Sequence, residues 1–239
     1  MSDDIALDSL NTLDPNEPVV TLHIGFLLMP EYTLSTFSNA VGILRMANRL
    51  SGRELYRWST YSLMGEPVTS SSGLNIQVDG ALDSATEVKI LMVCGGYNIK
   101  HYCSKILSDR LRSFAKNKIP LGALCTGTYA LANAGLLDGY RCTIHWENLA
   151  SMREEFPKLQ LSSSLFAIDR DRYTCSGGIS SIDLMLNLIT SIHGHQLVQK
   201  ISEQFTCDRV RTEKDAQRAP LQYLIGASQP RLVDAVTLM

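Results

Sequence analysis

The stretch IPLGALCTGTYALANAG, residues 119–135, joins an apolar strand directly to a helix of small residues. Residues 119–124 are predicted to form a buried strand, and Gly135 suits the position just past the end of the following helix. Ala123 and Gly127 lie two positions before and after Cys125, as the sharp strand-to-helix turn of a nucleophile elbow requires. The stretch therefore predicts one strand-turn-helix unit with a cysteine at the carboxyl end of the strand.

The same alternation of strand and helix extends over most of the chain. Apolar runs bounded by Gly, Pro or Ser alternate with segments whose apolar residues recur every three or four positions. This pattern predicts an α/β fold with a doubly wound, mostly parallel sheet and helices on both faces. Besides the unit at 119–135, strands are expected at residues 19–28, 58–64, 88–94, 141–144 and 172–175, and helices at residues 34–50, 100–117 and 179–192.

Charge separates the amino-terminal end from the rest of the chain. Residues 1–18 contain five acidic residues and no Lys or Arg, and are predicted to be a flexible acidic lead-in. The formal net charge is −2, so the remainder carries about +3. Neither value is typical of a nucleic-acid-binding surface. We expect one domain over residues 19–207, with DNA contacts, if any, made by residues outside this chain.

Composition indicates a protein of the cytoplasm. The six cysteines form no Cys-x-x-Cys pair, so reduced thiols are expected. The apolar runs have the length of strands, and the acidic start lacks the features of a secretory signal, so no membrane association is expected. His193-Gly194-His195 has no third ligand nearby, and no complete phosphate-binding motif is present. We therefore expect neither a metal nor another cofactor.

A parallel sheet of this kind binds ligands beyond the carboxyl ends of its strands. The loops after Leu28, Cys94, Leu124, Ile144 and Cys175 are therefore expected to converge on one crevice. Aromatic residues in these loops could face a cationic nitrogen, although ordinary core packing is the alternative for Trp146. The candidate ligand-binding residues are Glu31, Tyr32, Thr36, Gly95, Gly96, Tyr97, Cys125, Thr126, His145 and Trp146.

Cys125 has three interpretations. At a helix N-terminus its thiol is expected to favour the thiolate, as a nucleophile or as part of an anion site, and it could also be a small structural residue at a tight turn. His145 follows the next strand, which is expected to be adjacent, so the imidazole could approach Cys125 as a base. We expect Cys125 to line a ligand pocket; Cys125 and His145 are the pair that an enzyme would use.

Three segments, residues 122–127, 134–139 and 143–146, together resemble the ThiJ/PfpI superfamily. More narrowly, they resemble its regulator branch, in which an amidotransferase-like domain precedes the DNA-binding domain of an AraC-type transcription activator. The resemblance implies a flavodoxin-like, class I glutamine-amidotransferase-like fold. Residues 217–221 and 229–239 resemble the connection into the helix-turn-helix domain of these regulators. Residues 208–239 are accordingly expected to be a linker toward a DNA-binding domain absent from this chain, which is then a piece of a longer protein.

The resemblance also implies a ligand class. Residues 37–40 and 47–56 are similar to regulators that sense quaternary amines such as carnitine and glycine betaine. The relatives that sense arginine share residues 145–146 and 217–221. The implied function is sensing of a small nitrogen-containing metabolite by a homodimer that contacts DNA only through the absent domain. The alternative is a Cys-dependent hydrolase or hydratase, but Thr36 is aligned with the carboxylate that the superfamily's enzymes place near the cysteine.

Overall fold

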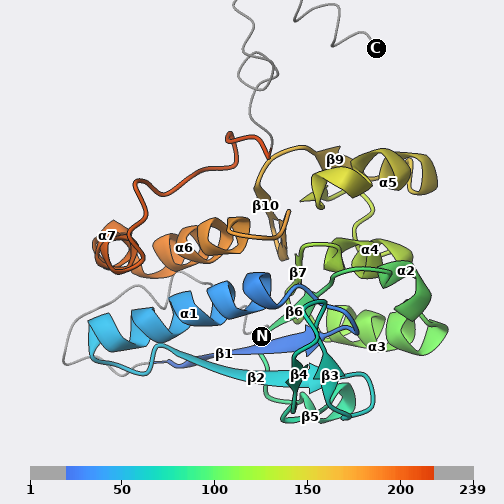
Figure 1. Cartoon of the computed structure of the whole chain (residues 1–239), viewed down its shortest axis with the longest axis horizontal. Helices are drawn as coiled ribbons and strands as arrows, with labels where there is room; N and C mark the ends of the chain where they lie inside the picture. The colour runs from blue at the N-terminus through green and yellow to red at the C-terminus, as the bar shows by residue number, and fades with distance from the viewer. Residues whose placement is uncertain (1–19, 218–239) are drawn as a thin grey trace, which may run out of the picture.

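The computed structural model describes residues 20–217 and contains a seven-stranded central sheet (Figure 1). The strand order is β10-β11-β7-β6-β1-β2-β5. All neighbouring pairs are parallel except β10 with β11, which are antiparallel. The mostly parallel sheet expected from the sequence is thus confirmed. The strands are β1 Leu22–Leu28, β2 Tyr56–Ser62, β5 Gly80–Ala81, β6 Ile90–Cys94, β7 Leu121–Leu124, β10 Phe166–Asp169 and β11 Arg172–Cys175.

Helices cover both faces of the sheet, as a doubly wound fold requires (Figure 1). One face carries α1 Leu34–Ser51, α6 Ser180–His193 and α7 His195–Gln204, whose buried residues join one core cluster. The other face carries α3 Lys105–Lys116 and α4 Gly127–Asn133, whose buried residues join a second cluster. Short helices also follow two strands: α2 Ile99–Tyr102 follows β6, and η3 Trp146–Asn148 and α5 Leu149–Glu155 follow β8 Arg141–Thr143.

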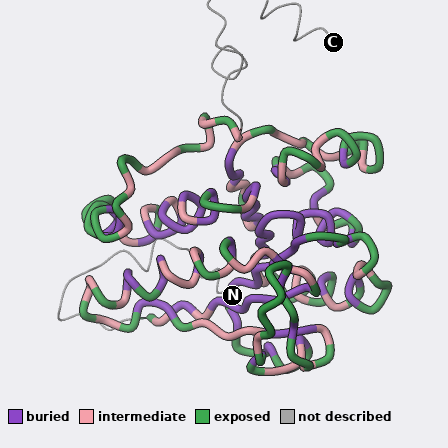
Figure 2. Tube along the Cα trace, viewed as in Figure 1, coloured by how far each residue is buried: buried purple, intermediate pink, exposed green. Residues whose placement is uncertain are grey.

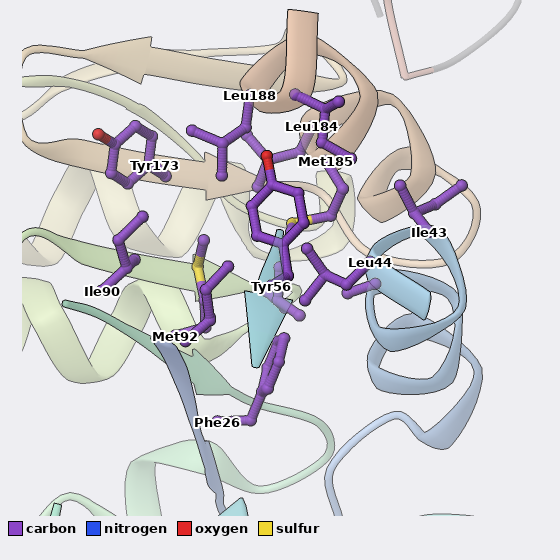
Figure 3. Close-up of a cluster of buried hydrophobic side chains, with 14 of the residues drawn as sticks. Phe26, Ile43, Leu44, Tyr56, Ile90, Met92, Tyr173, Leu184, Met185 and Leu188 are labelled. Carbon is purple, nitrogen blue, oxygen red and sulfur yellow. The ribbon is translucent and has the colours of Figure 1, made fainter. Parts of the chain in front are cut away.

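The central strands supply both clusters because successive side chains of a strand point to opposite faces. In β1, Phe26 and Leu28 belong to the cluster under α1, and Leu27 belongs to the cluster under α3 and α4. Figure 3 shows the first cluster, where Tyr56 points toward Leu188 of α6. The buried trace is continuous through the middle strands and gives way to exposed segments at the rim (Figure 2). The strands therefore form a rigid base for the loops at their carboxyl ends.

Several elements differ from the sequence-based expectation. The helix expected at 100–117 is divided into α2 and α3, because the Ser104 hydroxyl accepts a hydrogen bond from the Leu107 N–H and begins a new helix. The strand expected at 141–144 is β8 Arg141–Thr143, which pairs with β9 Gln160–Ser162 outside the central sheet. Its expected place beside β7 was wrong, since β11 occupies that position. The hairpin of β3 Val68–Thr69 and β4 Asn75–Ile76, the 3-10 helix η2 Leu82–Ser84 and helix α7 had no counterpart in the prediction.

After α7 the chain runs back over the domain. Arg211 forms an ion pair with Asp183 of α6, and Ala216 forms a β-bridge with Ser164. Residues 208–217, the first part of the expected linker, therefore lie against the domain. The acidic lead-in before Val20 and the remainder of the linker after Gln217 lie outside the described residues.

Candidate functional site

Five loops at the carboxyl ends of the strands surround one cleft of about 530 Å³. The loops after β1, β6, β7, β8 and β11 contribute Thr33, Gly96, Cys125, His145 and Gly178, respectively. These are the five loops whose convergence the strand pattern predicted. The cleft therefore lies where parallel α/β sheets bind ligands.

One wall of the cleft is the strand-to-helix turn after β7. Cys125 has a φ of 59°, in the left-handed region that non-glycine residues rarely adopt. Backbone segments crowd this turn: a Cβ built on Gly127 would lie 2.1 Å from the Val93 carbonyl oxygen, and one on Gly96 would lie 1.8 Å from the Glu31 carbonyl oxygen. Glycine is required at both positions because the neighbouring atoms belong to the backbone. The turn is the nucleophile elbow that the sequence predicted.

The Cys125 thiol is buried, with 7% of the residue exposed. The Thr33 hydroxyl donates a weak hydrogen bond to Sγ over 3.7 Å, and the Thr126 N–H also points to the sulfur. Burial nevertheless raises the pKa of Cys125 above its usual value, and the Glu147 carboxylate adds to the effect. The thiol is therefore protonated at neutral pH. The expectation that the helix N-terminus favours a thiolate was wrong, because desolvation outweighs the two hydrogen bonds.

Thr33, and not Thr36, is the threonine beside the cysteine. Thr36 is buried in α1, and its hydroxyl accepts a hydrogen bond from the Gly178 N–H at 2.8 Å. Thr33 precedes the first residue of α1 and lines the cleft. The alignment of Thr36 with the superfamily's carboxylate stays a prediction, whereas the hydroxyl that is hydrogen-bonded to the thiol is that of Thr33. Neither hydroxyl can take a proton from the thiol as a carboxylate would.

The opposite wall consists of the loop after β8 and helix α5. His145 Nδ1 lies 3.6 Å from Glu147 Oε2, and the ring of Trp146 lies 5.7 Å from the His145 ring. Among the hydrogen bonds of residues 20–217, none joins Cys125 to His145. The two residues of the enzyme alternative therefore share a cleft without forming a hydrogen-bonded nucleophile-base pair.

Basic side chains enter the cleft from α2 and from the loop after β8. Lys100, His101 and His145 all line the cleft. Lys100 Nζ lies 2.5 Å from Glu155 Oε2 and 5.1 Å from the centre of the Tyr129 ring. The hydrogen bonds from Lys100 and from the Tyr129 hydroxyl lower the pKa of Glu155. Lys100 is thus held at the rim of the cleft by a polar cluster that includes α5.

A second hollow of about 660 Å³ adjoins the cleft, and its charged lining residues are all acidic. Ser71 and Tyr97 line both spaces, so the two are neighbours. Carboxylates of Glu31 and Glu66 and the rings of Tyr97 and Tyr102 line the second hollow, together with apolar residues of β1 and the β3–β4 hairpin. None of its lining residues is Lys, Arg or His. The hollow is therefore suited to an organic cation.

The ten candidate residues divide between several locations. Five of them line the cleft: Gly96, Tyr97, Cys125, Thr126 and His145. Glu31 lies in the adjoining hollow, where its carboxylate accepts a hydrogen bond from the Asn98 amide at 2.9 Å. Four line neither space: Tyr32, Thr36, Gly95 and Trp146.

Burial explains two of these four positions. Tyr32 is fully buried, its ring packs edge-on against Phe37 at 5.9 Å, and burial raises its pKa to about 12. Gly95 is occupied by backbone contacts, since its carbonyl accepts a hydrogen bond from the Thr33 N–H and a Cβ would lie 2.1 Å from the Gly127 nitrogen. Both residues are therefore part of the packed framework and do not line the cleft.

Sequence reasoning missed most of the charged and polar lining. Lys100 and His101 lie on α2, and Glu147 and Ser151 follow β8, on helices too short for a recognisable pattern. The only available signal was their position within a few residues of a strand end. Thr33 lies in the loop after β1, one of the five predicted loops, but is not among the ten candidate residues.

Within residues 20–217, no helix has the length and apolar character needed to cross a membrane. In the same range, no group of three or more His, Cys, Asp or Glu side chains is arranged to hold a metal ion.

Comparison with known proteins identifies regulators and an enzyme among the relatives of this chain. The family model described as DJ-1/PfpI family matches residues 30–191. The HTH-type transcriptional regulator GbdR of Pseudomonas aeruginosa is 50% identical over 216 residues, which cover 90% of this chain and 59% of the regulator. The chain therefore spans less than two thirds of the length of that relative.

Proteins of different kinds are similar to this chain. The crystal structure of an AraC family transcriptional regulator from Pseudomonas putida has a TM-score of 0.70 and 28% identity, and the match covers 77% of this chain and 99% of that one. Isonitrile hydratase of Pseudomonas putida is 26% identical over 188 residues, covering 77% of this chain and 78% of the enzyme. Regulators are thus more similar to this chain than the enzyme is.

Proposed function

The chain belongs to the DJ-1/PfpI family, and from this premise we propose that it is the effector-sensing part of an AraC-type transcriptional regulator. The effector is a small nitrogen-containing metabolite, a quaternary amine or a basic amino acid. Its binding controls DNA binding by a carboxyl-terminal domain outside these 239 residues. The sensing unit acts as a homodimer in the cytoplasm, without a cofactor.

The charge division between the cleft and the adjoining hollow is the observation that carries this proposal. Lys100, His101 and His145 line the cleft with one carboxylate, that of Glu147, whereas the charged residues of the hollow are Glu31 and Glu66 alone, and Tyr97 lines both spaces. A zwitterion placed across Tyr97 meets a complementary charge at each end. A cation over a tyrosine ring gains about 2 kcal/mol when it is desolvated.

The carboxylate of the effector is assigned to the basic side chains. The backbone near Gly96 and Thr126 is a less favourable place for it, because the Thr126 hydroxyl donates to the Gly96 carbonyl at 2.6 Å and the Thr126 N–H points to the Cys125 sulfur. A carboxylate would have to displace these bonds. Lys100 offers a charge that is half exposed at the rim.

The rival function is a Cys-dependent hydrolase or hydratase, and the relation to isonitrile hydratase gives it a basis. Three features of the site favour the sensor. The pKa of Cys125 is raised, His145 forms no hydrogen bond to the thiol, and Thr33 stands beside the sulfur where a proton-sharing carboxylate is absent. A nucleophilic thiol needs a lowered pKa or an adjacent base.

A thermal-shift screen of the purified chain tests the proposal. The panel is glycine betaine, carnitine, choline, arginine and lysine, applied to the wild type and to Cys125→Ala. A ligand at one hundred times its Kd stabilises by about 2.7 kcal/mol, which raises the Tm by several degrees. We expect one compound to shift both proteins equally. A shift that disappears with the thiol would instead support the enzyme, and no shift with any compound would refute the sensor.

A further inference from the structure

The side-chain amide of Gln217 binds the backbone directly behind the His145 wall of the cleft. Its Nε2 lies 2.9 Å from the Thr143 hydroxyl, 2.9 Å from the Ile144 carbonyl oxygen and 3.0 Å from the Ser164 carbonyl oxygen. The Gln217 N–H also donates to the Ser163 carbonyl, at 3.3 Å. One residue near the carboxyl-terminal end of the described chain therefore joins β8 to the segment between β9 and β10.

These acceptors are connected to both walls of the cleft. Ile144 is buried and directly precedes His145, which lines the cleft. The Thr143 carbonyl accepts a hydrogen bond at 2.8 Å from the Thr128 hydroxyl of α4, the helix that follows the elbow. A shift of the loop after β8 therefore changes the position of the acceptors that Gln217 uses.

The rest of the returning segment contacts other parts of the domain. Arg211 is held by the buried Asp183 of α6, and Glu213 bonds Arg141 and the Ile168 N–H. Within residues 208–217, Gln217 alone bonds the backbone beside the cleft. Its Oε1 is buried and has no hydrogen-bond partner among the described residues. The Gln217 side chain is thus held through its Nε2 donor alone, and two of the acceptors, the Thr143 hydroxyl and the Ile144 carbonyl, depend on the geometry of β8.

We propose that Gln217 is a positioning residue for the His145 wall, and that through it occupancy of the cleft is transmitted to the chain that follows residue 217. The inference rests on the proposed sensor function. An effector that contacts His145 and Glu147 favours one position of the loop after β8, and the Gln217 hydrogen bonds differ between the positions. By linkage, release of Gln217 alters effector affinity by the same factor.

Hydrogen exchange measured by mass spectrometry tests the positioning role without any ligand. The variants are Gln217→Met, which keeps the length of the side chain but removes the donor, and Gln217→Glu, which places an acceptor against two carbonyls. Gln199→Met on the exposed face of α7 is the matched control. We expect exchange at residues 143–149 and 163–167 to become about tenfold faster in Gln217→Met and faster still in Gln217→Glu, with β1 and β6 unchanged.

Which variant exchanges faster separates hydrogen bonding from packing. Glu matches the shape of Gln more closely than Met does, so faster exchange in Gln217→Glu than in Gln217→Met must come from the lost hydrogen bonds. If residues 143–149 exchange at the same rate in both variants as in the wild type, the inference is overturned. A uniform increase across the sheet would also overturn it, since that result would indicate a general loss of stability.

A second arm uses glycine betaine as the probe. In the wild type, glycine betaine is expected to slow exchange at residues 145–152 and at 205–217, whereas in Gln217→Met only the first segment responds. An equal response of residues 205–217 in both proteins would overturn the transmission role. If glycine betaine binds neither protein, the sensor proposal loses support, and the ligand-free arm still decides the role of Gln217.

Discussion

The two walls of the cleft are built in different ways. The elbow wall is made of buried backbone, in which Gly96 and Gly127 leave no space for a Cβ and the Cys125 thiol is buried. The wall after β8 is made of polar side chains on short helices and is held by contacts from distant segments, Lys100 on α2 and Gln217 near residue 217. The first wall belongs to the framework of the fold. The second lies outside the central sheet and depends on side-chain contacts, and in the proposed function it is the part that reports occupancy.

Substitution of an elbow glycine gives the largest expected effect. In Gly127→Ala the new methyl group would meet the Val93 carbonyl oxygen at 2.1 Å, and backbone cannot move aside as a side chain can. We expect a loss of at least about 3 kcal/mol, or a Tm lower by roughly 6 to 12 °C. Calorimetric melting checks this. Gly42→Ala in α1 is the control, because its methyl group would meet only the ring of Phe205, at 3.2 Å. Equal Tm values for the two variants would contradict a rigid elbow.

Substitution in the second wall should change affinity and leave stability nearly unaltered. Lys100→Met removes the charge assigned to the effector's carboxylate, and its ion pair with Glu155 is half exposed and therefore worth little. We expect about tenfold weaker effector binding, equivalent to about 1.4 kcal/mol, and a Tm within about 2 °C of the wild type. Lys105→Met on α3 is the control, since Lys105 is exposed and lies outside the cleft. An unchanged affinity in Lys100→Met would remove Lys100 from the site.

The reactivity of Cys125 offers a smaller test of the first wall. Burial raises the pKa of its thiol, so the thiolate fraction at pH 7 is lower than that of a free cysteine. We expect iodoacetamide to modify Cys125 several-fold more slowly at pH 7 than glutathione, by peptide mass spectrometry. Modification faster than glutathione would indicate a thiolate, and would favour the enzyme.

Acid should loosen the second wall before the first. The pKa of Glu155 is lowered by Lys100 and Tyr129, so its contribution to stability is complete above the unfolded value of 4.5 and is lost as the pH falls below it. We expect Trp146 fluorescence, measured in Trp58→Phe, to change below about pH 4.5 while the far-ultraviolet circular dichroism persists. This change in Trp146 fluorescence should be absent when Glu155→Gln is combined with Trp58→Phe. Coincident loss of both signals in every variant would mean that the walls unfold together.

The sequence predicted the framework better than the site. Alternating strands and helices with an elbow at Cys125 are local patterns, so the parallel sheet and the five converging loops could be read directly. The position of β8 outside the sheet could not be predicted, because Arg141–Thr143 is too short to show a pattern that separates a central strand from a peripheral one. Its partner Gln160–Ser162 has no distinctive pattern either.

Within the loops, sequence position does not determine which side chains face the cleft. Tyr32 and Thr33 are neighbours, yet Tyr32 packs into the core against Phe37 while Thr33 reaches the cysteine. Lys100 and Gln217 reach the second wall only because α2 and the returning segment are folded against it. Such contacts depend on tertiary structure, and no local motif marks them.

Isothermal titration calorimetry with glycine betaine, carnitine and arginine tests the sensor most directly. The proteins are the wild type, Lys100→Met and Glu31→Gln, which remove one charge from each side of Tyr97. We expect one compound to bind the wild type at one site per chain and to bind each variant about tenfold more weakly. Binding that neither substitution affects, or no binding of any of the three compounds, would contradict the assignment of this cleft as an effector site.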